Sequence, residues 1–221
     1  MRSLTLSRPW RRRAIDMSGA SLSKYRPLQG SLQGRPRYVD YLQALSRLPT
    51  ELALQRAAPY LAHLVEDFAF FEAEIGPLLD GTADTRADWY VANEYEGSDR
   101  SFSLQVFVWP PGTGTKIHDH SSWGVYCCAV GSVLEERFER LDDGSRLDHA
   151  RLKKVWELMW SKEDGASSVL PGDGGIHRVG NPGDGMAISV HLYGPRLGEI
   201  DGRDYDPSRD YVCDRRDDQA V

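Results

Sequence analysis

The feature that most constrains the fold is a series of short runs, rich in aromatic and β-branched residues, that begins near residue 88. The run SFSLQVFVW alternates strictly, and its apolar face carries Phe102, Leu104, Val106 and Val108. Runs such as GVYCCAVG, SVLEERFERL and AISVHLY follow, separated by turns such as LDDGS, SKEDGA and NPGDG. Many short strands joined by tight turns predict a mainly β fold, an antiparallel barrel or double-sheet roll over about residues 88–213.

A different periodicity precedes these strands. Apolar residues recur at steps of three and four in YVDYLQALSRL and PYLAHLVEDFAFFEAEI, which predicts amphipathic helices over about residues 37–79 that cover the sheet. His63 lies in the second segment, and we interpret it as structural. We expect residues 31–221 to form a single domain with a helical N-terminal cap. The arginine-rich start RSLTLSRPWRRR is followed by no apolar signal segment, so residues 1–30 are predicted to be a disordered tail. The alternative is that this start is upstream sequence and that translation begins at Met17.

Composition excludes several classes of function. The 221 residues are 40% hydrophobic and carry a formal net charge of −6, which argues against nucleic-acid binding. No apolar run reaches the roughly 20 residues that span a bilayer, so we expect no membrane insertion. The three cysteines (Cys127, Cys128 and Cys213) are odd in number and lack zinc-ligand spacing, which favours buried thiols in a reducing, cytoplasmic compartment. We expect a monomer or a weak homo-oligomer.

The stretch TKIHDHSSWG places two histidines one residue apart. In a strand, His118 and His120 project from the same face while Asp119 turns away. This spacing permits a metal site without requiring one, because an ordinary hydrogen-bonded or surface histidine pair is commoner. A site inside a barrel needs ligands from separate strands, and LPGDGGIHRVGN supplies His177. Three imidazoles suit a first-row divalent ion.

A second constellation lies in SVHLY. Ser189, His191 and Tyr193 are at positions i, i+2 and i+4, so a strand would align all three along one face. A hydroxyl could then orient an imidazole that hydrogen-bonds a phenol, and such a chain can position a proton beside bound oxygen. Three polar residues on a solvated strand face are the alternative, which the neighbouring histidine group makes less favourable.

These residues resemble the two motifs of the cupin family. The first motif is matched by Gly112, His118, Asp119, His120, Gly124 and Gly131; the second is matched by Gly165, Pro171, Gly174, His177 and Asn181, with one residue added between the proline and the following glycine. The resemblance implies a cupin barrel. Gly124 stands where the usual first motif has a glutamate, which leaves three histidines and no carboxylate. Such a site keeps the full double charge of its ion and favours an anionic ligand such as a thiolate.

The region from Tyr90 to Pro195 resembles the thiol dioxygenases, the cysteine dioxygenase group within the cupins, through IHDH, HRVGN and SVHLYGP. The resemblance implies an enzyme that adds both atoms of O2 to a small thiol, giving a sulfinate. It implies that Fe(II) is bound by His118, His120 and His177. It also implies a relay whose phenol faces the iron, formed by Ser189, His191 and Tyr193. Similar dioxygenases have a cis bond at the position of Gly194 and Pro195, so we expect one here.

Two departures from this family bear on the substrate. Animal-type enzymes carry a cysteine crosslinked to the active-site tyrosine, whereas the best-matching position here is Gly124, as in the bacterial mercaptopropionate-type enzymes. No thioether is therefore expected at Tyr193. In WYVANEY, Ala92 falls where the animal-type enzymes have an arginine, so a bidentate clamp on a carboxylate is absent there. We expect cysteine to be a poor substrate and 3-mercaptopropionate or a larger thiol acid to be a better one.

The remaining substrate contacts are less constrained. Tyr90 and Tyr193 are candidate polar contacts, and the candidate anion partners are Arg178, Arg196 and Arg203, although each arginine is more commonly an ordinary surface residue. Two alternative functions stay open. One is another metal-dependent cupin enzyme, such as a dioxygenase of a non-thiol substrate or a sugar isomerase. The other is a non-catalytic metal-binding sensor, which would not need a proton relay.

Overall fold

The structure of the chain is a computed structural model that describes residues 36–79, 87–97, 100–196 and 201–215. The predicted tail, residues 1–30, lies outside this described part. Among the residues that the structure describes, no helix combines the length and the apolar character needed to cross a bilayer.

The predicted helical zone is confirmed. It comprises α1 (Pro36–Ser46), α2 (Thr50–Glu66), α3 (Phe68–Phe70), the π-helical turn η2 (Phe71–Ile75) and α4 (Gly76–Leu79). Asp67 separates α2 from α3. Its backbone N–H donates to the carbonyls of His63 and Leu64, and its side chain accepts a hydrogen bond of 2.8 Å from the backbone N–H of Phe70. One residue therefore ends one helix and caps the next.

Short antiparallel strands follow. They are β1 (Tyr90–Glu96), β2 (Ser103–Trp109), β3 (Ile117–His118), β4 (Gly124–Val130), β5 (Ser132–Arg140), β6 (Leu152–Ser161), β7 (Ala166–Val169), β8 (His177–Gly180), β9 (Ala187–Tyr193), β10 (Gly202–Asp206) and β11 (Tyr211–Arg215). Single 3-10 turns, η3 (Lys162–Asp164) and η4 (Gly172–Gly175), lie before β7 and β8.

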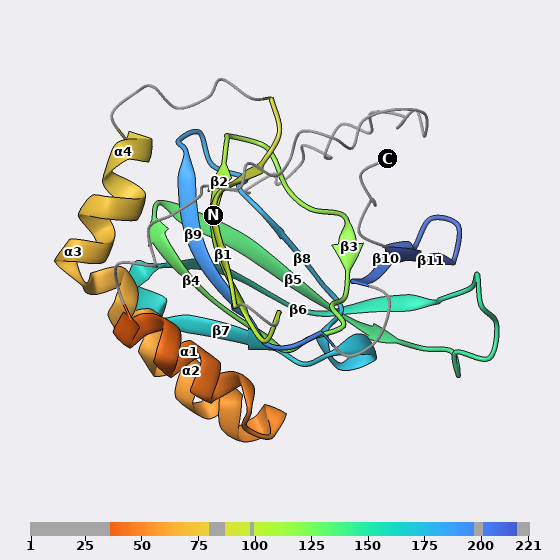
Figure 1. The fold of residues 1–221 in the computed structure, drawn as a ribbon. Coiled ribbons are helices and arrows are strands. Elements are labelled where there is room, and N and C mark those ends of the chain that lie inside the picture. Colours follow the sequence, from red (N-terminus) through yellow and green to blue (C-terminus); the bar gives the residue numbers. More distant parts are fainter. Residues whose placement is uncertain (1–35, 80–86, 98–99, 197–200, 216–221) are drawn as a thin grey trace, which may run out of the picture.

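The strands form two sheets. The five-stranded sheet has the order β1-β2-β9-β4-β7, and the six-stranded sheet has the order β11-β10-β3-β8-β5-β6. Helix α2 packs on β4, β7 and β9, so the helices cover the outer face of the five-stranded sheet (Figure 1). The predicted mainly β, cupin-type roll with N-terminal helices is confirmed.

Strand β2 separates two apolar clusters. Its even-numbered residues Leu104, Val106 and Val108, together with Phe102 just before the strand, face the helices, as the alternation predicts. They belong to a helix-side cluster that includes Leu61 of α2. Phe107 and Trp109 face the other way, into an inner cluster between the two sheets. The adjacent thiols of β4 divide in the same manner: Cys127 joins the helix-side cluster, and Cys128 joins the inner one. Both are buried free cysteines, as predicted.

The helical layer should contribute strongly to stability. Leu61 is 0% exposed, so Leu61→Ala should leave a cavity beneath α2 and lower the free energy of unfolding by about 2–5 kcal/mol. Urea denaturation followed by tryptophan fluorescence measures the change. Leu147→Ala is the matched control, because Leu147 is 97% exposed and its truncation should cost less than about 0.5 kcal/mol. Equal effects of the two variants would contradict this account of the core.

Candidate active site

The three predicted histidines meet inside the roll. His118 of β3 pairs directly with His177 of β8, and His120 follows β3 by two residues. All three are buried, and one nitrogen from each lies within 4.8 Å of the others. Strand pairing therefore brings together ligands that are far apart in the sequence.

The hydrogen-bond partners of these imidazoles bear on which nitrogen of each ring carries the proton. Nδ1 of His118 lies 2.9 Å from the carbonyl oxygen of Lys116, which can only accept, so Nδ1 carries the proton and Nε2 keeps its lone pair. Nε2 of His120 lies 3.1 Å from Nε2 of His177. Imidazole nitrogens bind a divalent ion at about 2.0–2.1 Å, so two nitrogens that share one ion must lie within about 4.2 Å of each other. The donor set and its spacing fit a divalent ion.

Asp119 turns away from the histidines, as the alternation predicts. It is 1% exposed and accepts hydrogen bonds from the backbone N–H of Arg203 at 2.6 Å, from Arg203 Nε at 2.8 Å and from the hydroxyl of Tyr205 at 2.7 Å. Arg203 also donates to Asp173 at 2.6 Å. The structure thus places Arg203 where it anchors the histidine-bearing segment, and its predicted contact with a substrate stays a prediction.

The structure also brings together the predicted relay. Ser189 Oγ lies 2.7 Å from His191 Nε2, and His191 Nδ1 lies 3.1 Å from the Tyr193 hydroxyl. The indole N–H of Trp109, which can only donate, reaches Ser189 Oγ at 2.8 Å. Within the described residues, His191 is then the acceptor for the buried Ser189 proton. The hydrogen bonds therefore run from Trp109 through Ser189 and His191 to Tyr193.

Burial fixes the protonation state of this relay. Desolvation and, to a smaller extent, the nearby His177 lower the pKa of His191 to about 3, although the charge of Glu135 acts in the opposite direction. His191 is therefore neutral near pH 7. With Nε2 accepting from Ser189, Nδ1–H donates to the oxygen of Tyr193, so the phenolic proton is directed to an acceptor other than His191.

Tyr193 connects the relay to the group of three histidines. Its ring centroid lies 4.9 Å from that of His120. In the paired strand, Gly124 faces Tyr193, and a Cβ atom at Gly124 would lie 3.2 Å from Cδ1 and Cε1 of the tyrosine ring. Glycine at this position leaves room for the ring and supplies no thiol. The absence of a thioether at Tyr193 stays a prediction.

Tyr90 and Ala92 lie on the helix-covered side of the sheet. Tyr90 belongs to the helix-side cluster, and Ala92 packs against the same cluster at an irregularity between Val91 and Asn93. Strand β1 instead directs Val91 into the inner cluster. This placement does not bring Tyr90 or Ala92 to the histidines, so their contact with a substrate remains a prediction.

Sequence reasoning missed a polar group on the inner face of the five-stranded sheet. Glu94 accepts hydrogen bonds from Gln105 at 2.6 Å and from Ser103 at 3.0 Å, and Gln105 is paired with His191. Burial raises the pKa of Glu94, whereas these hydrogen bonds and the charge of Arg196 lower it. The Nε of Arg196 itself lies 3.6 Å from Asp201.

Sequence reasoning also missed Tyr126 and Glu135, which contact His177 Nδ1 at 3.1 Å and 3.4 Å. Burial favours a raised pKa for Glu135, but the hydrogen bond from His177 and the charges of His177 and Arg137 outweigh it and hold the pKa at about 2. Burial and the neighbouring Glu135 raise the pKa of Tyr126 well above its usual value. Both residues lie on strands, so the sequence signal for the direction of their side chains was the alternation of inward and outward positions.

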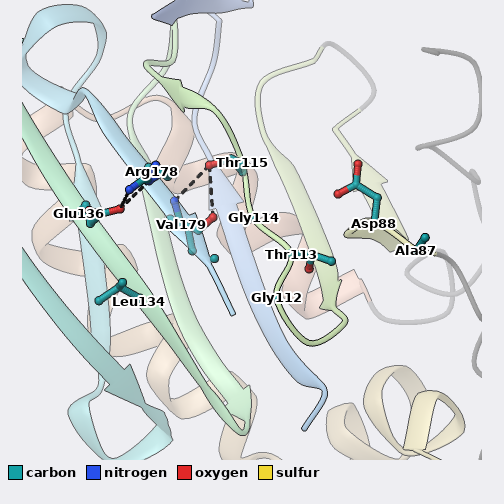
Figure 2. A pocket seen from close by; sticks show the side chains of 11 residues that line it. Ala87, Asp88, Gly112, Thr113, Gly114, Thr115, Leu134, Glu136, Arg178 and Val179 are labelled. Atoms are coloured by element: carbon teal, nitrogen blue, oxygen red, sulfur yellow. Dashed lines mark hydrogen bonds and ion pairs between the residues drawn. The ribbon is translucent and has the colours of Figure 1, made fainter. Parts of the chain in front are cut away.

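Arg178 lies on the outside of the roll. It forms an ion pair with Glu136. Arg178 follows His177 on β8 and Glu136 follows Glu135 on β5, so the side chains of Arg178 and Glu136 lie on the face of the sheet opposite to His177 and Glu135. They line a pocket of about 260 Å3 whose other walls include Asp88 and Leu134 (Figure 2). This pocket contains none of the three histidines.

The prediction of a cis bond between Gly194 and Pro195 is wrong, because the bond is trans. The backbone N–H of Gly194 donates to the carbonyl of Trp123 at 3.0 Å, which extends the pairing of β9 with β4 by one residue. A Cβ atom at Gly194 would lie 2.2 Å from the indole of Trp123, so only glycine fits this approach. The backbone thus remains extended where it leaves β9.

Two facing antiparallel sheets with three convergent histidines define a metal-binding cupin. The family model of cysteine dioxygenase type I matches residues 84–207, which is more than half of the chain. The chain belongs to the cysteine dioxygenase type I family. Together, the family match and the histidine group make it a metal-dependent cupin dioxygenase.

Similar solved structures share only part of their length with this chain. The protein TT1209 from Thermus thermophilus is 22% identical, with 43% of this chain and 74% of that chain covered at a TM-score of 0.32. A cupin 2 conserved barrel domain protein from Salinispora arenicola is 16% identical, with 48% and 72% covered and a TM-score of 0.33. Oxalate oxidase in complex with glycolate is 17% identical, with 49% and 52% covered and a TM-score of 0.38.

The buried neutral His191 should make stability depend on pH. Its pKa is about 3 in the folded state and about 6.5 when unfolded, so the unfolded state binds more protons between these values. Stability should be complete above about pH 6.5 and fall by up to about 1.4 kcal/mol per pH unit as the pH decreases toward 3. Urea denaturation of metal-free protein at about pH 7 and pH 5.5 measures this change.

His191→Gln removes the titrating group and should flatten the decrease between these two pH values. The control is His63→Gln, which removes an exposed histidine of α2 and should preserve the decrease. If His191→Gln and the unmodified protein lose stability in parallel, His191 does not titrate as described.

Proposed function

We propose that the protein is an Fe(II)-dependent thiol dioxygenase, which converts a small thiol and O2 to a sulfinic acid. The reaction is balanced without a further reductant, since RSH and O2 together contain the atoms of RSO2H. The observation that carries the proposal is the buried group of His118, His120 and His177 beside the phenol of a hydrogen-bonded relay. Membership of the cysteine dioxygenase family supports the same reaction.

His118, His120 and His177 would hold the iron, which would supply the redox chemistry between the thiol sulfur and O2. None of these ligands carries a negative charge, and Gly124 stands where the usual cupin motif has a glutamate. The site therefore attracts an anionic thiolate more strongly than a site that includes a carboxylate ligand. The same charge favours loss of the thiol proton.

The relay holds a proton at the Tyr193 hydroxyl. Ser189 and Trp109 fix the tautomer of His191, whose Nδ1–H then occupies a lone pair of the phenol oxygen. The phenolic O–H can donate to an anionic atom of the substrate or product near His120. Because Ser189 and His191 are buried and the histidine is neutral, the relay orients this proton without introducing a second positive charge.

We further propose that cysteine is a poor substrate and that 3-mercaptopropionate or a larger thiol acid is a better one. The position at which animal-type enzymes have an arginine is Ala92, whose side chain packs on the helix side. Arg178 is paired with Glu136 outside the roll, and Arg203 is engaged by Asp119. Arg196 is also paired, with Asp201 at 3.6 Å, but its charge lowers the pKa of the inner-face Glu94, and for this reason we favour it as the partner for a substrate carboxylate.

The metal assignment can be tested with a histidine variant. His177→Ala should abolish oxygen uptake with a thiol panel and sharply weaken Fe(II) binding, because it removes one of three ligands. The unmodified protein should bind one Fe(II) per chain, and mass spectrometry should show thiols gaining two oxygen atoms. His63→Ala is the matched control and should retain both properties. Full turnover in His177→Ala would rule out this metal site.

The substrate assignment can be tested at Arg196. Arg196→Gln should lower kcat/KM for 3-mercaptopropionate by about tenfold to a hundredfold, the equivalent of about 1.5–3 kcal/mol for a charged hydrogen bond. It should leave kcat/KM for cysteamine, which has no carboxylate, within about twofold. Arg178→Gln is the control, because Arg178 lies on the outer face.

The same measurements compare kcat/KM of the unmodified enzyme for four thiols, namely cysteine, 3-mercaptopropionate, mercaptosuccinate and cysteamine. If cysteine leads this series, the interpretation of Ala92 is wrong. If Arg196→Gln affects cysteamine and 3-mercaptopropionate equally, Arg196 does not bind the carboxylate.

A further inference from the structure

A buried carboxylate lies directly behind one metal ligand. Glu135 of β5 is 0% exposed, and its Oε1 accepts from the Tyr126 hydroxyl at 2.5 Å and from Arg137 Nε at 2.8 Å. The same oxygen lies 3.4 Å from His177 Nδ1, and Oε2 accepts from Ser167 Oγ at 2.8 Å. Both carboxylate oxygens are therefore held by donors on four different strands.

These contacts determine the tautomer of His177. The single proton of the Tyr126 hydroxyl goes to Glu135 at 2.5 Å, so the phenol oxygen can only accept from His177 Nδ1, 3.1 Å away. Whether Nδ1 donates to Tyr126 or to Glu135, it must carry the proton. His177 Nε2 is then left with a lone pair directed at the point where the three histidines converge.

Tyr126 also joins this carboxylate to the relay. Its ring stacks on His191, with centroids 5.1 Å apart and an interplanar angle of 22°. Arg137 continues the network in the other direction, from β5 to Ser167 at 2.7 Å and to the carbonyl of Ser168 at 2.8 Å. Ser167 and Ser168 belong to β7, so the network connects the two sheets beneath the metal site.

We propose that Glu135, acting through Tyr126, is a positioning residue that fixes the tautomer and orientation of His177 and increases its basicity toward the metal ion. A carboxylate behind a metal-binding imidazole has this effect in general, and its loss typically weakens metal binding by about 10–100-fold. The inference rests on the proposed function, because it takes the three histidines to be metal ligands.

The adjacent residue of the same strand provides a matched control. Glu136 points to the outer face of the sheet, where it pairs with Arg178 at the edge of the outer pocket (Figure 2). Glu135→Gln and Glu136→Gln therefore remove the same charge from neighbouring positions on opposite faces. Only the first substitution changes the surroundings of His177.

The experiment measures metal binding rather than turnover. Fe(II), added anaerobically, and Co(II) are titrated against a competing chelator, and the visible absorption of the Co(II) protein reports the ligand field. Glu135→Gln should weaken the binding of both ions by about 10–100-fold and shift the Co(II) absorption bands. Glu136→Gln should bind both ions within about twofold of the unmodified protein, with an unchanged spectrum.

Two further variants keep the test decisive if Glu135→Gln folds poorly because Arg137 loses its partner. Glu135→Gln combined with Arg137→Gln removes both charges, and circular dichroism checks its fold. Tyr126→Phe keeps the carboxylate but removes the bridging hydroxyl. It should weaken Co(II) binding in the same direction by a smaller factor and also shift the spectrum. Unchanged affinity and spectrum in Tyr126→Phe would overturn the part assigned to Tyr126.

The outcomes separate this inference from the function on which it rests. If the unmodified protein fails to bind one ion per chain, the proposed metal site itself is wrong. If it binds one ion and folded Glu135→Gln, alone or with Arg137→Gln, binds equally tightly with the same spectrum, Glu135 does not position His177. In that case the proposed dioxygenase function stands.

Discussion

The antiparallel pairing of His118 with His177 is the contact on which the rest of the site depends. Strand β3 has only two residues, yet β10 pairs with its other side, and Asp119 is fixed by Arg203 and Tyr205. The histidine-bearing segment is thus held by backbone pairing on both sides and by a buried carboxylate. The imidazole nitrogens converge because of the sheet, so an ion would meet ligands that are already oriented.

Much of the fold and part of the site could be predicted from the sequence. Alternation is reliable where one face is uniformly apolar, which is why the even-numbered residues of β2 were placed correctly. The spacing of His118 and His120 and that of Ser189, His191 and Tyr193 fix a shared face by geometry alone. The convergence of these two groups depends on strand order, which the family resemblance supplied and the local sequence did not.

The features that the sequence did not reveal, and the one prediction that was wrong, have equally specific causes. In SVLEERFER both faces of the strand mix apolar and charged residues, so alternation could not tell the inward Glu135 from the outward Glu136. The irregularity after Val91 breaks the period of β1, and no residue in WYVANEY signals it. A cis bond before Pro195 was predicted because the similarity to other dioxygenases outweighed the general preference for trans bonds. The bond is trans, and the contact of Gly194 with Trp123 favours an extended backbone there.

The position of Glu135 changes how the charge of the site should be understood. With Gly124 in place of the usual glutamate, the described group of three histidines includes no carboxylate, and Gly124 leaves space for the Tyr193 ring. A carboxylate is nevertheless present one imidazole away, where Arg137 partly neutralises it. Its field therefore acts mainly on His177, through hydrogen bonds, and only weakly on the substrate side of the ion. In the proposed enzyme, this arrangement would strengthen a metal ligand while preserving the positive charge that attracts a thiolate.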